Sequence, residues 1–383
     1  MKICFVTHKV KKGDGQGRVN YEVIAEAVKE RHDVIIISSE LSEELRAHPQ
    51  ITWVKIGTSW IPTMLLKYQW FALYSAIWIW THQRGIDLVV VNGFITYARS
   101  DINCIHFVHS AWIRSKYHPF REQKNAKSLY QFIYNGLNAL LERLALQQTR
   151  QIVAVSEQVK EELVQDAYIQ AHRISVVSNG VDLNEFYPRT VNRADFNLAV
   201  ERTYALFAGD LKSKRKNLDT VLAALAKVED IELIVLGYTE KSPYPQLAQE
   251  LGISDRVHFL GYRQDVADMM SLADLFIFPS RYEPFSLVIL EAMASGLPVI
   301  TSNRCGAVEL LSNQSAVIIE DPDDTSALIQ ALRDLSSDRE LLELMARRAR
   351  EDAQSNSWEL MSSKYMQLFY KTSNLKFKTG NQA

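Results

Sequence analysis

The sequence predicts an α/β protein of two doubly wound, Rossmann-like domains that face each other across a cleft. Three observations favour this fold class. A chain of 383 residues is too long for one compact core. Short β-branched runs alternate with helical stretches, which is typical of parallel sheets covered by helices on both faces. The alternation then starts again after residue 200, which indicates a second domain of the same kind.

The strands expected in the two halves are short apolar runs, each followed by a polar loop or a helical stretch. In the first half they are Ile3–Thr7, Val34–Ser38, Leu88–Asn92, Ile105–His109 and Ile152–Val155. In the second half they are Ala205–Ala208, Glu232–Leu236, Val257–Leu260, Leu275–Phe278, Val299–Thr301 and Val317–Ile319. Between the halves, the turn signal Asn179-Gly180 and the polar residues after Pro188 indicate a linker near residues 180–200.

Composition excludes several function classes. The net charge of −2 gives no reason to expect nucleic acid as a partner. The cysteines Cys4, Cys104 and Cys305 are scattered, which fits neither a disulfide framework nor a metal site and favours buried thiols in a reducing cytoplasm. The chain enters a strand directly at its N-terminus, so no signal peptide is expected.

The stretch from Trp60 to Arg84 is apolar and rich in tryptophan. It is about long enough to span a bilayer, but Lys67 and Gln69 interrupt it, so a true span is not expected. Two alternatives stay open. The helix packs inside its domain, or it exposes part of one face to a membrane surface or a lipid-linked substrate.

Ligands of doubly wound sheets bind beyond the carboxyl ends of the strands, so the loops after strands are the candidates. Gly13, Gly15 and Gly17 follow the first strand and precede a helix that we expect to begin near Arg18. Such a loop favours contact with a phosphate or an acceptor, the alternative being a flexible surface turn. The spacing matches neither a dinucleotide-binding G-x-G-x-x-G nor a P-loop, which argues against both enzyme classes.

Two histidines, His106 and His109, end a predicted strand of the first half. Their spacing on a strand places them on opposite faces, which is poor for joint metal ligation. His109 lies nearer the carboxyl end and is the better candidate for the cleft. His106 is expected in the core or against a helix.

The first strand of the second half leads into a basic loop. Lys212, Lys214, Arg215 and Lys216 cluster before a helix whose expected N-cap is Asn217. Cations beside a helix N-terminus suit a diphosphate. The alternative is a solvated basic loop.

The stretch "RYEPFSLVILEAMASGLPVI" (residues 281–300) contains a pair of glutamates. A loop over residues 279–286 is expected to present Glu283 to the cleft, followed by a helix over Leu287–Ser295. The amides of residues 285–287 would be free donors at its N-terminus. Glu291, a little over one turn into the helix, can point back toward the same cleft.

A possible metal motif, Asp321-Pro322-Asp323, precedes another helix. Helix capping by Asp323 or Asp324 explains the pattern without a metal ion.

Taken together, these motifs resemble the retaining glycosyltransferases of family 4, which have the two-domain GT-B fold. The resemblance rests on "IVAVSEQVKEEL", "ISVVSNGVDLNEFYP", "FAGDLKSKRKNLDTVL", the long stretch "GYRQDVADMMSLADLFIFPSRYEPFSLVILEAMASGLPVITS" and "SWELMSSKYMQLFYK", in that order along nearly the whole chain. It implies an N-terminal acceptor-side domain over residues 1–182 and a nucleotide-sugar domain over 183–356. A C-terminal helix over 357–383 would cross back to the first domain.

The resemblance also implies roles for particular residues. Glu291 would hydrogen-bond the ribose of a nucleotide-sugar. Glu283 and the backbone of Phe285, Ser286 and Leu287 would hold the donor sugar and its phosphates. Lys216 and Arg215 would neutralise the diphosphate leaving group, and His109 would contact the sugar near the reacting carbon. Tyr262 and Arg263 would meet the base, and the loop of Gly15, Gln16 and Gly17 would close on the phosphates and the acceptor.

Two residues depart from the family pattern. Asp210 stands where the family often has an arginine, so its carboxylate must turn away from a diphosphate or pair with a neighbouring cation. Ser286 replaces the common glycine of "EPFG"; its amide is kept, but its Cβ restricts the backbone.

The reaction implied by the resemblance is transfer of a hexose from a nucleoside-diphosphate sugar, UDP-glucose first, to a hydroxyl of a glycan or lipid-linked glycan in envelope or extracellular polysaccharide synthesis. The anomeric configuration would be retained, with no protein nucleophile and no metal or other cofactor. A glycosidase also uses paired carboxylates, but a basic loop has no use in hydrolysing a neutral glycoside. Two alternatives stay open: a GT-B epimerase acting on a UDP-sugar, and a non-catalytic nucleotide-sugar-binding protein. Peripheral contact with the inner face of the plasma membrane is a further expectation, and the sequence leaves the oligomeric state open.

Overall fold

The computed structural model describes the backbone of residues 1–380 and the side chains of residues 1–374. The chain divides into two compact units. Unit 1 contains Met1–Asn179 together with Trp358–Ala383, and unit 2 contains Gly180–Ser357. The last segment predicted from the sequence, 357–383, contains one helix, and its residues 381–383 lie outside the described part.

Unit 1 is built on a seven-stranded sheet in which every neighbouring pair is parallel. The strand order is β5-β3-β1-β6-β7-β8-β9. The strands are β1 Lys2–Val6, β3 Asp33–Ser38, β5 Ile51–Lys55, β6 Leu88–Asn92, β7 Ile102–Ile105, β8 Gln151–Ala154 and β9 Ile174–Val176. A separate two-stranded ladder joins β2 Lys9–Val10 to β4 Glu40–Leu41.

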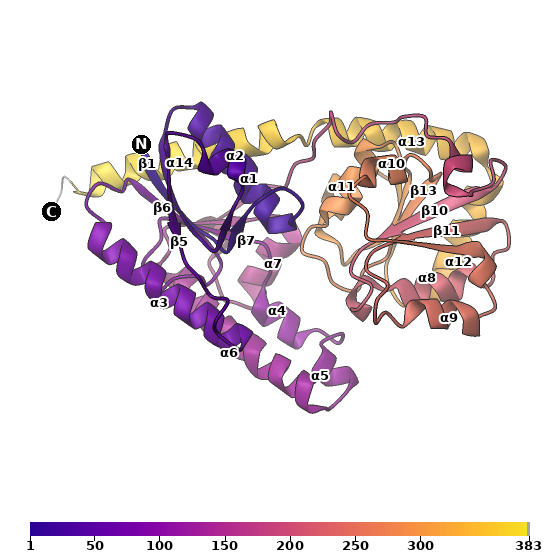
Figure 1. Cartoon of the computed structure of the whole chain (residues 1–383), viewed down its shortest axis with the longest axis horizontal. Helices are drawn as coiled ribbons and strands as arrows, with labels where there is room; N and C mark the ends of the chain where they lie inside the picture. Colours follow the sequence, from indigo (N-terminus) through magenta and orange to yellow (C-terminus); the bar gives the residue numbers. More distant parts are fainter. Residues whose placement is uncertain (381–383) are drawn as a thin grey trace. The chain divides into compact units, whose positions relative to one another are not determined.

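The helices of unit 1 cover this sheet (Figure 1). They are α1 Gly15–Lys29, α2 Glu43–Arg46, α3 Met64–His82, α4 His109–Arg114, α5 Pro119–Glu122, α6 Ala126–Gln148, α7 Glu157–Gln165, the 3₁₀ turn η1 Ala171–Arg173 and α14 Trp358–Gly380. The last of these, α14, packs against α1. Phe369 of α14 contacts Phe5 of β1 with ring centroids 5.9 Å apart, so α14 contributes to the core of the first unit.

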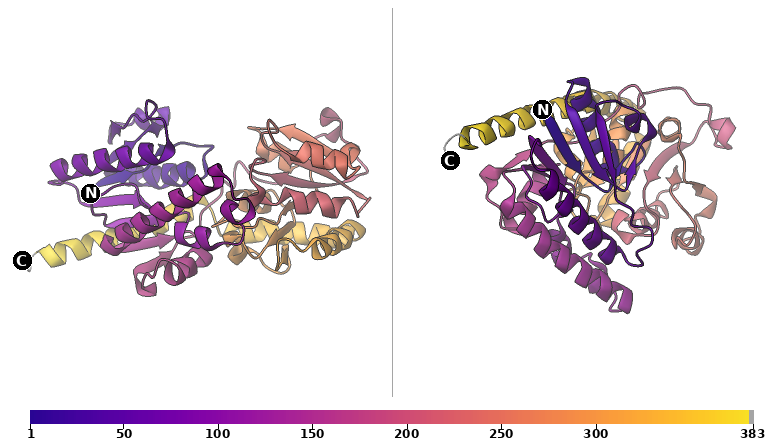
Figure 2. Two further views of the ribbon diagram at one scale, coloured as in Figure 1. Left: turned by 90° about the horizontal axis from the view of Figure 1, so that it is seen from below. Right: turned by 60° about the vertical axis from the view of Figure 1, so that its left-hand side comes forward.

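Unit 2 is a second parallel sheet, with six strands in the order β12-β11-β10-β13-β14-β15. Its strands are β10 Thr203–Ala208, β11 Ile231–Leu236, β12 Val257–Gly261, β13 Leu275–Phe278, β14 Val299–Ser302 and β15 Ala316–Ile319. Its helices are η2 Arg193–Phe196, η3 Lys214–Lys216, α8 Leu218–Leu225, α9 Tyr244–Glu250, η4 Ser254–Arg256, α10 Val266–Met270, α11 Leu287–Ala294, η5 Gly306–Leu310, α12 Thr325–Ser337 and α13 Arg339–Gln354. The views of Figure 2 show helices on both faces of each sheet.

These two sheets confirm the predicted fold class of two doubly wound α/β domains. In each, strand order reverses beside the first strand: between β1 and β6 in unit 1, and between β10 and β13 in unit 2. Such a switch point opens a crevice at the carboxyl ends of the strands. The predicted basic loop follows β10 and the predicted glutamate loop follows β13, so the two loops flank the switch point of unit 2.

Two local predictions were wrong, and two strands of the large sheet were not predicted. The predicted strand Ile105–His109 is instead the end of β7 at Ile105, and His109 begins α4. Helix α1 begins at Gly15, before the predicted Arg18, because the Asp14 side chain caps it by accepting from the Gly17 amide at 2.8 Å. Strands β5 and β9 were not predicted; β5 is only half-buried and contains Thr52 and Lys55, so its apolar signal is weak.

Candidate functional site

The basic loop after β10 is tightly folded. The amide of Gly209 donates to Leu236 O at 3.1 Å, and a Cβ on Gly209 would lie 3.3 Å from the Phe278 ring and 3.6 Å from Lys216 Cγ. Ser213 Oγ accepts from the Arg215 amide at 3.2 Å and so caps the turn η3. A side chain at this position would therefore crowd the Phe278 ring, whereas its distance from Lys216 would be an ordinary contact.

Asp210 turns toward its own loop. Its Oδ1 accepts from the Lys212 amide at 3.0 Å, so the carboxylate closes a short turn of the backbone. The carboxylate is thus paired with a backbone amide of its own loop.

Asn217 stands at the predicted N-cap position of α8, but it does not cap with its side chain. Its Nδ2 donates to Pro279 O at 2.8 Å and to Pro322 O at 2.6 Å, and its φ is +67°. The side chain is fully buried. Asn217 therefore ties the basic loop to the loops after β13 and β15, a role that its place before a helix did not indicate.

Glu283 lies at the centre of this cluster. Lys216 Nζ donates to Glu283 Oε2, and Arg215 Nη1 lies 3.8 Å from the same oxygen. The side chains of Lys216 and Glu283 are only 14% and 15% exposed. Burial raises the pKa of the Glu283 carboxyl, but Lys216 and Arg215 lower it more, so its pKa lies below the usual value. Glu283 is therefore ionised and held between two cations.

The loop that carries Glu283 is fastened to the segment after β14. The Glu283 amide donates to Arg304 O at 2.9 Å, the Gly306 amide donates to Glu283 O at 2.8 Å, and the Ala307 amide donates to Phe285 O at 2.8 Å. Phe285 is buried. This short parallel bridge joins the backbone that leads into α11 to the segment after β14.

Ser286, which replaces the glycine of the family pattern, adopts a backbone conformation that favours glycine. It precedes α11 with φ +85°, a region that side chains other than glycine rarely adopt. It is 7% exposed, and its Oγ is buried with no hydrogen-bond partner among the described residues. Strained backbone and an unsatisfied hydroxyl at a helix N-terminus are features that persist at functional sites.

Glu291 lies in α11, as predicted, four residues after its first residue Leu287. Its side chain is half-buried, whereas its neighbours Ile289, Leu290 and Ala292 are fully buried. The carboxylate is thus on the one side of α11 that reaches solvent. The helix ends at Ala294 and is followed by Gly296 with φ +77°, as its sequence predicted.

Tyr262 and Arg263 follow β12, in a different loop from Glu283. Tyr262 is 53% exposed and stacks on Tyr238, which follows β11, with ring centroids 4.7 Å apart and planes at 5°. An exposed pair of stacked rings offers a flat surface on which a base can stack. Arg263 donates from Nε to Asp265 Oδ1 at 2.8 Å, so part of its guanidinium is already used inside the loop.

In unit 1, His109 sits at the start of α4 in a hydrogen-bonded network. Its Nδ1 lies 3.1 Å from Asn135 Oδ1, and its amide donates to Glu142 Oε1 at 3.3 Å. Burial lowers the pKa of His109 to about 4, and the hydrogen bond to Asn135 offsets only part of that shift. The imidazole is therefore neutral at physiological pH.

The network also assigns the tautomer of His109. Asn135 Nδ2 lies 2.9 Å from Gln131 O and 3.1 Å from His118 Nε2. Because the Gln131 carbonyl can only accept, the NH₂ group of Asn135 must point toward it. The side-chain oxygen of Asn135 then faces His109. An amide oxygen only accepts, so Nδ1 of His109 carries the proton and Nε2 keeps a lone pair. His109 can then accept a hydrogen bond from a hydroxyl.

Gly15, Gln16 and Gly17 form the first turn of α1 rather than a loop before it. A Cβ on Gly17 would lie 2.9 Å from Asp14 Oδ1, so glycine is needed for this cap. The Gly17 amide already donates to Asp14 Oδ1. The free amides that a glycine-rich loop suggests are thus partly used by the helix cap itself.

Thus the structure brings Glu283, Lys216 and Arg215 into direct contact, with residues 285–287 next to them in the chain. Tyr262 and Arg263 stand on another loop at the same edge of the sheet of unit 2, whereas His109 and the residues of Gly15–Gly17 belong to unit 1. Tyr238, Asn135 and Glu142 were missed. Only the position of Tyr238 directly after a strand could have pointed to it from the sequence.

His106, and the aspartates Asp323 and Asp324 before α12, have structural rather than metal-binding contacts. His106 Nε2 is buried without a hydrogen-bond partner among the described residues, which fits the core role expected for it. Asp324 caps α12 by accepting from Ala327 N at 3.0 Å, and Asp323 pairs with Arg281. No group of three or more His, Cys, Asp or Glu side chains that could hold a metal is found in the described part of the chain.

Comparisons with known proteins agree with this geometry. The sequence model described as "Glycosyltransferase Family 4" matches residues 13–185, and the one described as "Glycosyl transferases group 1" matches residues 188–352. The UDP-Gal:alpha-D-GlcNAc-diphosphoundecaprenol alpha-1,3-galactosyltransferase of Escherichia coli is 27% identical over 67% of this chain and 66% of its own length. The match thus spans slightly less than two thirds of that relative.

Solved structures with the same fold cover nearly the whole chain. Sucrose-phosphate synthase from Thermosynechococcus elongatus has a TM-score of 0.79 at 20% identity, covering 97% of this chain and 98% of its own. HepE of Anabaena, solved in complex with UDP-glucose, has a TM-score of 0.71 at 20% identity, covering 97% of this chain and 100% of its own. With one family model over each unit, the chain belongs to the family 4, group 1 glycosyltransferases.

Proposed function

We propose that the protein transfers a hexose from UDP-glucose, or a closely related UDP-sugar, to a hydroxyl of a glycan or lipid-linked glycan, with retention of the anomeric configuration. The observation that carries the proposal is the buried Glu283 held between Lys216 and Arg215, beside the N-terminus of α11 and at the switch point of unit 2. Two cations face one carboxylate here, so the site has an excess of positive charge. The negative charge of a nucleoside diphosphate would balance that excess.

The cations act on the leaving group. As the bond between the sugar and the diphosphate breaks, negative charge develops on the phosphate oxygens. Lys216 and Arg215, which otherwise compensate Glu283, would then share their charge with the diphosphate, and the amides of residues 285–287 would donate to it. Such preorganised donors do not reorganise during the reaction, so the proposed mechanism needs no metal ion.

The carboxylates position the donor. Glu283 accepts hydrogen bonds only, because its low pKa keeps it ionised, and sugar hydroxyls are matching donors. Glu291, on the solvent side of α11, would accept from the two ribose hydroxyls. The stacked pair of Tyr238 and Tyr262 would hold the base.

In the proposed reaction, unit 1 supplies His109 and binds the acceptor. His109, neutral and with its Nε2 lone pair available, would accept a hydrogen bond from a sugar hydroxyl near the reacting carbon. The Escherichia coli relative is named for a lipid-linked acceptor, which supports a lipid-linked glycan here. The three cysteines are unpaired and buried, which supports a reducing, cytoplasmic location.

The test is a thermal-shift screen of UDP-, GDP- and ADP-sugars against the wild type and Lys216→Ala. A ligand present at about 100 times its Kd stabilises the native state by about 2.7 kcal/mol. We expect UDP-sugars to raise the Tm of the wild type and to do so far less in Lys216→Ala. No rise with any nucleotide sugar would contradict the proposal. Product analysis by NMR then separates its alternatives: an epimerised donor would indicate an epimerase, and an unconsumed donor a binding protein.

A further inference from the structure

Helix α3 has no polar face. One side packs into the core of unit 1 through Phe71, Ala76 and Ile79. The other side exposes a stripe of apolar residues at helical spacing, each between 39% and 52% exposed: Leu66, Trp70, Leu73, Ile77 and Trp80. A surface helix normally turns charged residues outward, so a helix that is apolar all round indicates an apolar environment on its outer side.

The neighbouring helix α6 has a similar outward stripe. Leu129, Ile133, Leu140 and Leu144 are between 45% and 57% exposed. The two helices run side by side in Figure 1 and in both views of Figure 2. Tyr68 of α3 contacts Tyr134 of α6, with ring centroids 6.2 Å apart. The exposed apolar residues thus occur on two adjacent helices of one unit.

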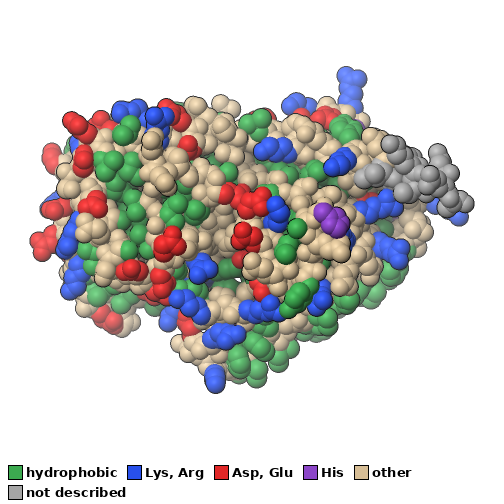
Figure 3. All heavy atoms as spheres, turned by 180° about the vertical axis from the view of Figure 1, so that it is seen from behind, with side chains coloured by type: hydrophobic (Ala, Val, Ile, Leu, Met, Phe, Trp, Pro, Cys, Tyr) green, Lys and Arg blue, Asp and Glu red, His purple; other side chains and the backbone are tan. Residues whose placement is uncertain are grey.

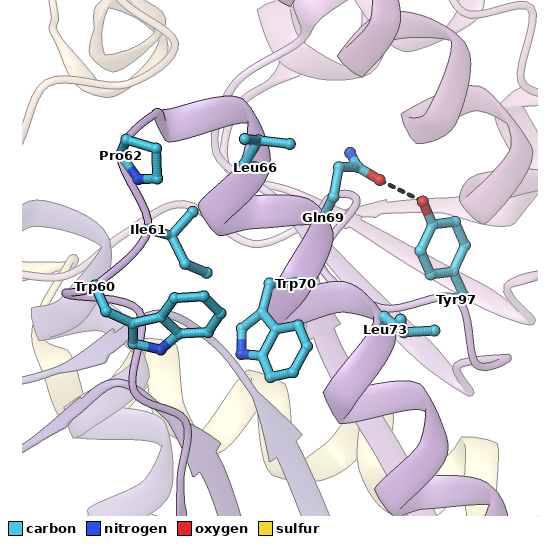
Figure 4. Close-up of a pocket in the computed structure, with 8 residues that line it drawn as sticks. All are labelled: Trp60, Ile61, Pro62, Leu66, Gln69, Trp70, Leu73 and Tyr97. Atoms are coloured by element: carbon cyan, nitrogen blue, oxygen red, sulfur yellow. Dashed lines mark hydrogen bonds between the residues drawn. The ribbon is translucent and has the colours of Figure 1, made fainter.

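A cavity opens beside α3 on the same stretch (Figure 4). It has a volume of about 720 Å³ and is lined by Trp60, Ile61, Pro62, Leu66, Gln69, Trp70, Leu73 and Tyr97. The rings of Trp60 and Trp70 form one wall, with centroids 5.5 Å apart. Tyr97 OH donates to Gln69 Oε1, which pairs these two oxygens, whereas Gln69 Nε2 is buried with no hydrogen-bond partner among the described residues. The remaining lining suits a hydrocarbon chain.

Charge on this surface has one sign. The sequence contains no Asp or Glu over residues 60–84 or over residues 123–141, and Glu142 is only 2% exposed. The same stretches carry Lys67, Arg84, Lys124 and Lys127. In Figure 3, green apolar side chains follow the lower edge of this unit, with blue Lys and Arg side chains beside them. The exposed Glu122 lies just before the second stretch, but within the two stretches cations stand without exposed carboxylates, which complements an anionic lipid surface.

We infer that the outer faces of α3 and α6 dock onto an anionic bilayer, and that a hydrocarbon chain of a lipid enters the cavity between Trp60 and Leu73. Tryptophan and tyrosine favour the boundary between headgroups and chains, and lysines reach the headgroup phosphates. No helix in the described part of the chain is long and apolar enough to cross a membrane, so the contact is peripheral.

The biological reason for this docking rests on the proposed function, because a lipid-linked acceptor is embedded in a bilayer. The binding itself is measured without turnover. The rival occupant is a second copy of this chain, which would also cover an apolar face but would gain nothing from the excess of cations, since like charges would meet across a symmetric contact.

The test measures flotation of the protein with vesicles of phosphatidylglycerol mixed with phosphatidylcholine, and of phosphatidylcholine alone, at low salt. The informative variant is Leu73→Glu, which places a carboxylate in the docking surface. Its matched control is Leu344→Glu on α13, because the two leucines lie on surface helices and are 45% and 43% exposed. Chain-brominated phosphatidylglycerol reports insertion, since bromine quenches tryptophans that enter the hydrocarbon region.

We expect the wild type and Leu344→Glu to bind the anionic vesicles alike, and Leu73→Glu to bind about ten-fold more weakly, because a charge replaces an inserted leucine. Brominated chains should quench the wild type. The inference is wrong if the wild type ignores anionic vesicles, if the two variants bind alike, if bromine does not quench, or if the wild type is a dimer that Leu73→Glu dissociates.

A UDP-induced rise in Tm provides the separate control for the proposed function, because the residues proposed to hold UDP all lie in unit 2. If vesicle binding fails while UDP still raises Tm, the membrane inference falls and the proposed donor site stands. If vesicles bind but no nucleotide sugar raises Tm, the proposed function falls and the membrane contact stands.

Discussion

Replacing Lys216 by methionine tests the charge balance of the proposed donor site. The side chains of Lys216 and Glu283 are 14% and 15% exposed, so the change leaves a nearly buried carboxylate with only Arg215, 3.8 Å away, as a partner. Breaking a buried pair by removing one partner costs about 3–5 kcal/mol. Because Arg215 remains, we expect Lys216→Met to lower the free energy of unfolding by about 3 kcal/mol at pH 7.

The direction with pH follows from the pKa of Glu283. In the wild type the folded pKa lies below its unfolded value, so Glu283 contributes stability that is present at neutral pH and is lost as the pH falls through the folded pKa. In Lys216→Met, burial acts with less opposition and the pKa rises. The carboxylate is then protonated more easily, and the difference in stability between variant and wild type should shrink below about pH 5.

The assay is urea unfolding of four proteins: wild type, Lys216→Met, Glu283→Gln and the double variant. Because the two side chains are in contact, the double variant should be more stable than the sum of the single losses predicts, with a coupling of about 1–3 kcal/mol. Equal stability of Lys216→Met and the wild type at pH 7 would refute the reasoning, as would additive losses in the double variant.

Three further predictions concern single residues. Ser286→Gly removes a side chain from a positive-φ position together with a buried hydroxyl that has no partner among the described residues. The free energy of unfolding of the unliganded protein, measured in urea, should therefore rise by about 1 kcal/mol. The UDP-induced rise in Tm should shrink if Ser286 Oγ contacts the donor. Burial raises the pKa of Glu142 from 4.5 to about 8, and the hydrogen bond from the His109 amide opposes only part of that shift. The buried carboxyl therefore lowers the stability of the folded state increasingly as the pH rises from 4.5 to about 8. Glu142→Gln should be more stable than the wild type by a margin that is about 3 kcal/mol at pH 7 and vanishes below about pH 4.5. A gain independent of pH would contradict that account. In ¹H–¹⁵N NMR, His109 should show a protonated Nδ1 in the wild type, and Asn135→Leu should shift the ring toward the Nε2–H tautomer; a wild-type ring already protonated at Nε2 would overturn the assignment.

Much of the fold could be predicted because parallel strands buried on both faces are continuous apolar runs, as in Leu88–Asn92 and Leu275–Phe278. The errors have physical causes. The run "CIHFVHSAW" is apolar throughout, and periodicity alone does not show that Ile105 ends a strand and His109 begins a helix. The start of α1 was misplaced because glycines favour a loop, whereas Asp14 caps the helix and Gly17 makes room for that cap.

For the candidate site, local motifs could be found from the sequence and long-range partners could not. The glutamate loop and the basic loop each have a sequence signature, but the contact of Lys216 with Glu283 spans 67 residues and depends on β10 lying next to β13. Tyr238 and Tyr262 meet only because β11 pairs with β12. Glu142 resembled any glutamate on an amphipathic helix, and its burial against the start of α4 is a property of packing.

The most direct test of the central claim is the release of UDP from UDP-sugars, measured together with the anomeric configuration of the product by NMR, for the wild type and Lys216→Ala. The account predicts a product with the configuration of the donor. It also predicts that Lys216→Ala releases UDP about 10²–10³-fold more slowly, because one hydrogen-bond donor to the leaving diphosphate is lost. An inverted product, or UDP release by Lys216→Ala at the wild-type rate, would contradict it.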